Sequence, residues 1–452
     1  MPDPSRGFSL RTATFVVVSS TVGGGVLSTS GLVALDVQSN GLMLMLWVVG
    51  GLIAACGALA MAEVSAALPR SGGEFVILSE TYGPFVGFLG GWVSLLFGFI
   101  GPIAASSSAA SAYLIAPWGV SPVWIKPLAT LVIVGFGLAH AMGRSRTERV
   151  QGITTAATIA VLVAFVAFGV AAGWPNRASL LDVPPPSKIP WPSLFVGLIF
   201  VSYCYTGWNG ASYVAGEIAN PQHILPRAIV LGTIGVVLLY CGLNLAFALA
   251  MPIPDLQEIA LREGRDGVQK IAELASSRLF SPSATSIVSS SLGIVLLAAV
   301  SAMILTGPRV AFAMAGDGRL PAILGRLSSK TQTPAAATAF VAIGAIAMLW
   351  SGRFEQIVFA SGVGLALNSM LTIASVYVLR IMQPNLARPF RVPGYPVVPA
   401  IFLLLTAGSL GFAFLDKDSR PASVAGLAGV LMSAPLYGVS VIATSVRSRD
   451  RS

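Results

Sequence analysis

The sequence predicts an all-α polytopic membrane protein. Of the 452 residues, 55% are hydrophobic and only 10% are charged, whereas soluble domains carry about a quarter charged residues. The mean hydropathy is +0.81. The apolar residues fall in runs of about 20, the length that a helix needs to cross about 30 Å of hydrocarbon. The alternating stretches of about ten residues that mark a membrane β-barrel do not occur, so we expect helices alone.

Runs of membrane length predict about twelve transmembrane helices in a single domain, residues 1–452. The longest connection, residues 252–285, is charged and too short for a separate soluble domain, and we expect it to be part helical. The first run lacks a small-residue cleavage site and is therefore expected to stay as the first helix. The expected spans are 13–35, 41–67, 83–115, 125–141, 150–173, 193–217, 227–251, 286–315, 335–351, 354–381, 396–415 and 421–446.

The positive charge of the chain follows from its expected orientation. With the N-terminus inside, most of the 27 Lys and Arg residues fall on the cytoplasmic side of the predicted helices, as the positive-inside rule requires. Both termini are therefore expected in the cytoplasm, in a multi-pass protein of the cell membrane. The net charge of +9 then reflects topology and predicts no nucleic-acid partner.

The residues that carry catalysis or metal binding are few and scattered. Cys56, Cys204 and Cys241 lie in apolar runs without a metal-binding spacing, and His140 and His223 are far apart near segment ends. No nucleophile–base pair or carboxylate pair is visible. We therefore predict no catalytic residue, metal or cofactor. A channel would show a filter repeat, which the chain lacks, and a membrane enzyme or a transport-inactive sensor stays as the alternative of a different class.

The first span, 13–35, is expected to break near its middle. Residues 21–26 read TVGGGV, and three adjacent glycines give a helix much backbone freedom and no side-chain packing. A close helix–helix contact is the alternative interpretation, because small residues are common where membrane helices meet.

The sixth span, 193–217, contains a second irregularity. Residues 203–210 read YCYTGWNG, a polar and aromatic cluster with two glycines midway through the span. Lipid offers such groups no partners, so they should face protein or a water-filled cavity. An interfacial aromatic belt is the alternative, but belts lie at segment ends. The central position favours a binding site.

The two irregular spans are the first and the sixth, the corresponding members of two five-helix halves, 13–173 and 193–381. Two additional helices follow within 396–446. This placement indicates a secondary transporter built from an inverted repeat. Amides freed at each break carry partial positive charge and can bind a carboxylate, and freed carbonyls can accept hydrogen bonds from an ammonium group. The pattern therefore predicts an amino-acid substrate.

Five motifs in order along the chain carry a resemblance. They are VGGGVL from Val22, AEV followed by PRSGGEF from Ala62, YTGWN with the later EI, NP and LPRAI from Tyr205, GDGRLP from Gly316, and RPFRVP from Arg388. Together they resemble the amino acid–polyamine–organocation superfamily, and within it the L-type amino acid transporters and their bacterial relatives. The resemblance spans nearly the whole chain and implies a five-plus-five inverted repeat with two further helices.

The resemblance also implies roles for individual residues. The backbone of the first break would hold the substrate carboxylate, and the backbone of the second would take the amino group, with Tyr203 at the position of an aromatic gate. Trp208 would line the side-chain pocket, with Met303 of helix eight and Ala105 of helix three as further candidates. The expected substrate-binding residues are Thr21, Val22, Gly23, Gly24, Gly25, Val26, Tyr203, Cys204, Tyr205, Thr206, Gly207 and Trp208.

One departure from the family pattern concerns coupling. Several bacterial relatives carry a lysine in helix five that takes part in proton coupling or replaces a sodium ion, and the matching position here is Thr158. Thr158 and Ser301 of helix eight are instead candidates for a cation site, because hydroxyl oxygens suit hard cations. The alternative is that both hydroxyls bond only backbone or water. Proton and sodium coupling therefore stay open.

The expected substrate is a neutral L-amino acid, moved by exchange or by proton-coupled symport. No acidic residue is expected at the middle of the membrane, where an unpaired charge is expensive. Glu63 and Glu217 are interpreted as gate or structural charges paired with nearby arginines such as Arg70 or Arg227. Cationic amino acids or polyamines are the alternative, held over an aromatic face such as that of Trp208.

The expected partners are the amino-acid substrate, a coupling ion and membrane lipid. Some animal relatives attach a single-span accessory subunit through a cysteine outside helix three. The external loops of this chain contain no cysteine, so we expect a transporter without an accessory subunit.

Overall fold

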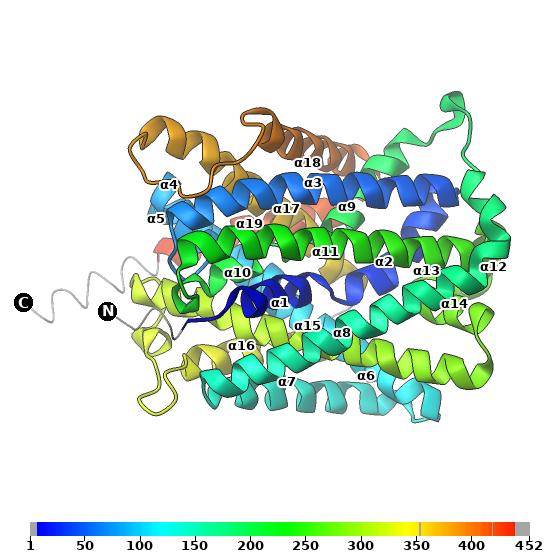
Figure 1. Cartoon of the computed structure of the whole chain (residues 1–452), viewed down its shortest axis with the longest axis horizontal. Helices are drawn as coiled ribbons and strands as arrows, with labels where there is room; N and C mark the ends of the chain where they lie inside the picture. The colour runs from blue at the N-terminus through cyan, green and yellow to red at the C-terminus, as the bar shows by residue number, and fades with distance from the viewer. Residues whose placement is uncertain (1–6, 352–353, 418, 439–452) are drawn as a thin grey trace, which may run out of the picture.

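The described part of the chain is a bundle of long helices. The computed structural model describes residues 7–351, 354–417 and 419–438, and within them one isolated β-bridge, between Phe8 and Ile218, is the only extended pairing. Figure 1 shows the long helices running side by side along the longest axis of the molecule. The prediction of an all-α polytopic membrane protein is confirmed.

The helices account for all twelve expected spans. Within the described residues, nine helices are long and apolar enough to cross a membrane, one further span is a bent pair of helices, and two apolar helices are shorter. The bounds are α1 Leu10–Thr21 with α2 Gly24–Val37, α3 Asn40–Ala67, α5 Pro84–Val93 with η2 Ser94–Ile100 and α6 Gly101–Ile115, α7 Ile125–Ala141, α8 Arg144–Gly173, α9 Trp191–Tyr205 with α10 Gly210–Tyr213, α11 Pro221–Ala250, α15 Pro282–Gly316, α16 Ala335–Ser351, α17 Phe354–Met382, α18 Val397–Leu415 and α19 Arg420–Leu431.

Local sequence signals set several helix starts. Ser9 and Ser39 precede α1 and α3, and the side-chain oxygen of each accepts a hydrogen bond from a backbone N–H in the first turn. Ser281 caps α15 in the same way. Pro221 occupies the first position of α11, where its missing N–H costs nothing. These caps satisfy amides that would otherwise lack partners in the membrane.

Two features depart from the expected spans. A separate short helix, α4 (Glu74–Tyr82), precedes the third span, and a π-helical segment, η2, interrupts that span. The connection 252–285 folds into α12 (Ile253–Glu263), α13 (Arg265–Val268) and α14 (Ile271–Leu279), so the expected helical content there is confirmed. The last expected span, 421–446, ends partly outside the described residues, which stop at 438.

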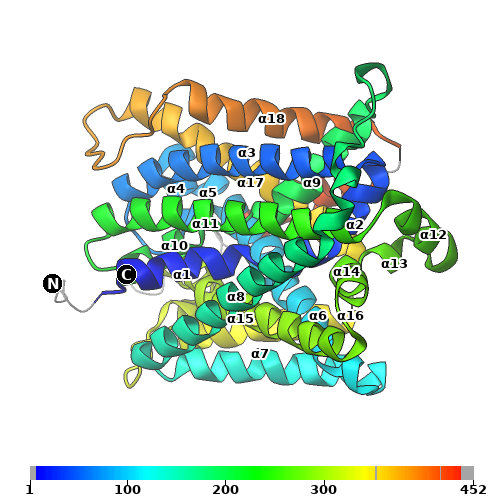
Figure 2. The ribbon, with the colours of Figure 1, turned by 45° about the vertical axis from the view of Figure 1, so that its right-hand side comes forward.

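The bent pair α1 and α2 lies in the interior of the bundle. α1 packs against α11, α8 and α15, and α2 packs against α9. Figures 1 and 2 show α18 at one edge of the bundle and α7 at the other, with α1 between them. The helices α12, α13 and α14 lie at the end of the bundle opposite to the start of α1. The interior position of α1 places its break where other helices can enclose it.

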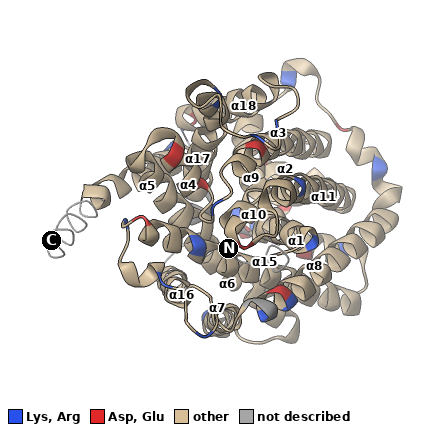
Figure 3. Cartoon of the chain, turned by 60° about the vertical axis from the view of Figure 1, so that its left-hand side comes forward, with Lys and Arg blue, Asp and Glu red and all other residues tan. Residues whose placement is uncertain are grey.

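Charged residues gather at the helix ends and in the connections (Figure 3). Glu63 bonds Arg380 of α17 at 2.8 and 2.6 Å, and Glu217 bonds Arg309 of α15 at 2.9 and 3.3 Å. The interpretation of both glutamates as paired charges holds, but the expected partners, Arg70 and Arg227, were wrong. Arg70 pairs with Glu80 and Asp317 instead. Glu63 and Glu217 bond Arg380 and Arg309 because helices that are distant in sequence lie side by side in the fold.

Candidate functional site

The first break separates α1 from α2 by two residues. Val22 and Gly23 have extended backbone, and the two helices are inclined by 42°. The first amides of α2, from Gly24 onward, have no carbonyl partner in the preceding turn. They carry the partial positive charge of a helix N-terminus. This end of α2 is suited to bind a carboxylate.

The second break separates α9 from α10. Residues 206–209 form an irregular stretch, and α10 is only four residues long. Gly207 has a φ of +111°, and a Cβ there would lie 2.4 Å from the carbonyl oxygen of Ser20. Both the positive φ and the close approach require glycine. The second break therefore packs directly on the end of α1.

A cavity lies where the two breaks meet. Nine of the twelve residues expected to bind substrate line it, together with Ala105 and Met303. The nine are Thr21, Gly23, Gly24, Gly25, Tyr203, Cys204, Thr206, Gly207 and Trp208. The structure thus brings together segments more than 170 residues apart in sequence.

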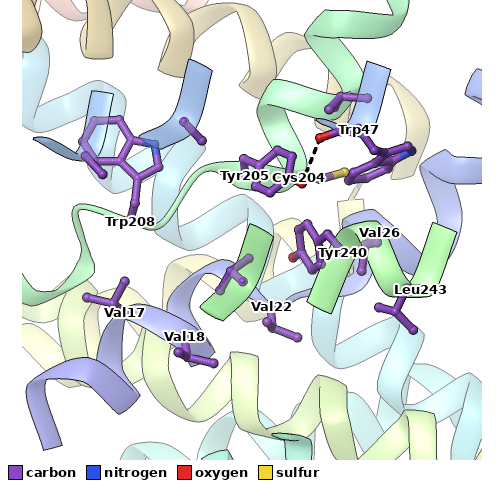
Figure 4. Packing of buried hydrophobic residues seen from close by; sticks show 14 of the residues in the cluster. Val17, Val18, Val22, Val26, Trp47, Cys204, Tyr205, Trp208, Tyr240 and Leu243 are labelled. Carbon is purple, nitrogen blue, oxygen red and sulfur yellow. Dashed lines mark hydrogen bonds between the residues drawn. The ribbon is translucent and has the colours of Figure 1, made fainter. Parts of the chain in front are cut away.

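The side chains of the other three expected residues pack elsewhere. Val22 and Val26 are fully buried in the apolar core. Tyr205 turns away from the cavity, and its hydroxyl donates to the carbonyl oxygen of Trp47 at 3.1 Å. Figure 4 shows Tyr205 and Tyr240 close to Trp47, whereas Trp208 lies apart from them on the stretch between α9 and α10.

Trp208 stands between two cavities. Its side chain is buried and lines both the cavity at the breaks and a second one behind α9. Its ring meets Phe402 of α18 edge to face, with centroids 6.2 Å apart. Gly57 of α3 leaves room for the indole, since a Cβ there would lie 3.3 Å from a carbon atom of Trp208. The ring is therefore a fixed wall of the cavity.

Tyr240 of α11 is a residue at the break that sequence reasoning missed. Its hydroxyl donates to the carbonyl oxygen of Thr21 at 2.8 Å. That carbonyl ends α1, so the bond satisfies a group freed by the break. A polar aromatic residue in the middle of the seventh span was the available signal.

Glu74 is a second missed residue. It begins α4, is 1% exposed and lines the cavity at the breaks. The expectation of no acidic residue at the middle of the membrane did not consider Glu74, because its motif follows the second span and resembles a loop. The short helix α4 folds back into the bundle and carries this carboxyl to the cavity.

The two residues proposed for a cation site occupy different settings. Ser301 bonds Nε2 of His140 at 3.0 Å and Oε1 of Gln151 at 3.4 Å, and the amide of Gln151 reaches Ser19 of α1. The hydroxyl of Thr158 is buried without a hydrogen-bond partner among the described residues. His140 lies in the last turn of α7, near a segment end as expected. It is 1% exposed because α7 packs against α15 and α8.

Comparison with known proteins adds four findings of similarity. The family described as "Amino acid permease" matches residues 8–427. The large neutral amino acids transporter small subunit 2 of Mus musculus is 27% identical over 448 residues, which cover 96% of this chain and 81% of the relative. The b(0,+)-type amino acid transporter 1 of Homo sapiens is 26% identical over 86% of this chain and 79% of the relative. The serine/threonine exchanger SteT of Bacillus subtilis is 25% identical over 96% of each chain.

Proposed function

The chain belongs to the amino acid permease family, and from that premise we propose that it moves neutral L-amino acids across the cell membrane by alternating access. It is an amino acid transporter and not an enzyme. One observation carries the proposal for its site. Both helix breaks line the same cavity, so amide and carbonyl groups freed from two helices surround one space.

The two breaks suit the two charged groups of an amino acid. The carboxylate would lie at the amides of residues 24–26, where α2 begins. The ammonium group would lie at the carbonyl groups near the end of α9, close to Tyr203. Trp208, Met303 and Ala105 would then surround the side chain of the substrate. Backbone groups alone would bind the carboxylate and the ammonium group, which all amino acids share. The side chains that line the cavity would select among substrates.

The cavity wall favours a neutral side chain. Phe99, Pro102, Met303 and Leu365 give it a largely apolar lining. The names of two relatives agree with a neutral substrate, since one is named for large neutral amino acids and another for serine and threonine. Cationic amino acids or polyamines are the second candidate, because the carboxyl group of Glu74 reaches the same cavity.

We further propose the topology expected from the sequence. Residues 13–173 and 193–381 would be the two inverted five-helix repeats, with 396–446 as additional helices. The breaks in the first and sixth spans support this division, because they fall at corresponding positions. Both termini would lie in the cytoplasm.

Transport would run by exchange or by proton-coupled symport. Sodium coupling through Thr158 and Ser301 is the second candidate. The buried hydroxyl of Thr158 without a partner among the described residues supports it, since an unsatisfied buried oxygen is costly unless a ligand occupies it. Against it, the hydroxyl of Ser301 already bonds His140 and Gln151.

We propose that the chain works without a covalently attached accessory subunit. The three cysteines, Cys56, Cys204 and Cys241, all lie within helices α3, α9 and α11 rather than in connections. Cys204 is buried and the other two are partly buried, and a thiol within a membrane helix is poorly placed to form a disulfide with the external part of another chain. Purification of the chain expressed alone, followed by transport assays, tests this point together with the function.

Counterflow in proteoliposomes tests the proposed function. The purified protein is reconstituted, one labelled neutral amino acid is loaded inside, and each unlabelled amino acid or amine is added outside in turn. Accelerated efflux with a set of neutral amino acids supports the proposal. Acceleration by arginine or polyamines alone moves the substrate to the cationic class. Folded protein that accelerates no efflux and drives no ion-coupled uptake contradicts the proposed transport.

A further inference from the structure

The carboxyl group of Glu74 lies in a buried cage of neutral donors. Its Oε2 accepts hydrogen bonds from the Ser94 hydroxyl at 2.9 Å and the Tyr213 hydroxyl at 3.2 Å. The side-chain amide of Asn368 donates to the same oxygen. The residue is 1% exposed, so water contributes little to its solvation. None of these three donors carries a charge.

Among the side chains that the structure describes, the charged groups on neighbouring elements are engaged elsewhere. α5, α17 and α15 pack against α4. α5 carries no charged residue, Arg380 of α17 pairs with Glu63, and Arg309 of α15 pairs with Glu217. Glu80, on α4 itself, pairs with Arg70 at the surface.

For a buried carboxyl group with only neutral donors, two opposing effects therefore decide between the ionised and the protonated form. Burial disfavours its negative charge, whereas the hydrogen bonds favour it. A group in such a balance changes between the ionised and the protonated form with small changes in its surroundings. A proton also needs no space, which suits a side chain that is almost completely enclosed.

The cage connects Glu74 to the parts of the protein that form the substrate site. The side-chain amide of Asn209, within the second break, donates to the Tyr213 hydroxyl at 3.2 Å. Tyr213 ends α10, Asn368 belongs to α17, and Ser94 begins the π-helical segment η2. Figure 3 shows α4, α10 and α17 close to one another. One carboxyl thus holds together four segments around the cavity.

We propose that Glu74 is the proton-binding group that couples an inward proton gradient to amino-acid uptake. Resting on the proposed transport function, this inference adds the site at which the proton is carried. The carboxylate takes a proton from water in the cavity while the cavity is accessible from outside, and the resulting acid returns it to water on the cytoplasmic side. No other bond forms or breaks.

Protonation would act on the cage through hydrogen-bond capacity. The ionised carboxylate only accepts, so it draws the three donors together and holds α10 and α17 against α4. The protonated acid has one oxygen that must donate, and its uncharged form binds the same donors less strongly. Loss of the charge therefore loosens the contact between the second break and α17. The substrate site and the proton site are linked through Asn209.

Proteoliposomes with and without a proton gradient test this inference. The wild-type protein is expected to accumulate substrate under an inward gradient and to lose accumulation when a protonophore is added. Glu74→Gln is expected to lose accumulation while still exchanging, at a rate that no longer depends on pH. Glu80→Gln is the matched control on the same helix, and it should accumulate substrate as the wild type does.

A second variant, Tyr213→Phe, tests the inference even if Glu74→Gln fails to fold. Tyr213→Phe removes one donor to the carboxylate, which weakens the ionised form and raises its affinity for a proton. The pH of half-maximal accumulation should therefore rise by about one unit. A merely structural loss would lower the rate without moving the pH profile.

Three results would overturn the inference. The first is accumulation by Glu74→Gln equal to that of the wild type. The second is a Glu74→Gln variant that loses only the exchange of arginine, at every pH. The third is wild-type uptake that does not change with the proton gradient. The second result would make Glu74 a contact for cationic substrates. These outcomes are separable from failure of the proposed function, in which wild-type counterflow itself would be missing.

Discussion

The hydroxyl group of Tyr240 donates a hydrogen bond of 2.8 Å to the carbonyl oxygen of Thr21, the last residue of α1. Tyr240 itself meets Trp47 edge to face, with ring centroids 5.6 Å apart, and Trp47 receives the hydroxyl of Tyr205 on its carbonyl oxygen. The ends of α1 and α9 are thus both attached to the same aromatic group (Figure 4). Hydrogen bonds from specific side chains therefore hold the helix ends at the two breaks in place.

Loss of the Tyr240 hydroxyl should weaken substrate binding. In Tyr240→Phe, the carbonyl of Thr21 loses its donor, at a cost of about 1 kcal/mol, or roughly a fivefold rise in KM for exchange. Tyr82→Phe removes a similar hydroxyl, bonded to the Leu371 carbonyl at 3.0 Å away from the cavity, and should leave KM unchanged. Equal effects of the two variants would argue against a special role of Tyr240.

A large side chain at the start of α2 should abolish transport. A Cβ at Gly24 would lie 3.6 Å from the nearest atom, a methyl carbon of Leu296, so alanine fits there but leucine would enter the cavity. We expect Gly24→Leu to lose counterflow and to remain monodisperse in size-exclusion chromatography. Gly135→Leu, on an open face of α7, is the control and should exchange normally. Normal exchange by Gly24→Leu would contradict the proposed carboxylate site.

Removal of the indole of Trp208 should change which substrates are preferred. The ring forms a wall of the cavity, so Trp208→Ala enlarges the space for the substrate side chain. Competition assays with a panel of amino acids should show a new order of preference that favours larger side chains. Trp124→Ala, at a position 59% exposed, is the control and should keep the original order. An unchanged order in Trp208→Ala would remove the indole from the side-chain pocket.

The contact between the two breaks should depend on the absence of a side chain at Gly207. Gly207→Ala combines an unfavourable positive φ with a Cβ 2.4 Å from a backbone oxygen of α1. Gly264→Ala shares the positive φ but has nothing within 4 Å of the added Cβ. The control should cost about 1 kcal/mol. We expect Gly207→Ala to lower the thermal unfolding temperature clearly more than Gly264→Ala does, and equal melting curves would show that the close approach carries no energetic weight.

The sequence predicted the breaks because their signals are local. Three consecutive glycines at 23–25 and the glycine at 207 report directly on backbone freedom, wherever the rest of the chain lies. The apolar runs likewise report on span length. The expected cavity residues therefore proved to lie together, although the side chains of Val22, Val26 and Tyr205 point into the core.

The residues that were missed depend on long-range packing. Glu74 reaches the cavity only because α4 folds back into the bundle, and its contact with Asn368 joins residues 294 apart in sequence. Glu63 and Arg380 are 317 apart. Neither hydropathy nor spacing encodes which helices become neighbours, so single-sequence reasoning paired Glu63 with the nearest arginine in sequence instead.

The central claim is that the substrate lies where the two breaks meet. Determination of the structure of the purified protein by electron cryomicroscopy, with a saturating substrate identified by counterflow, tests it most directly. The account predicts the substrate carboxylate within hydrogen-bond distance of the amides of residues 24–26 and the ammonium group beside the end of α9. Substrate density confined to the neighbouring cavity around Lys270 and Glu273, away from the end of α9, would contradict it.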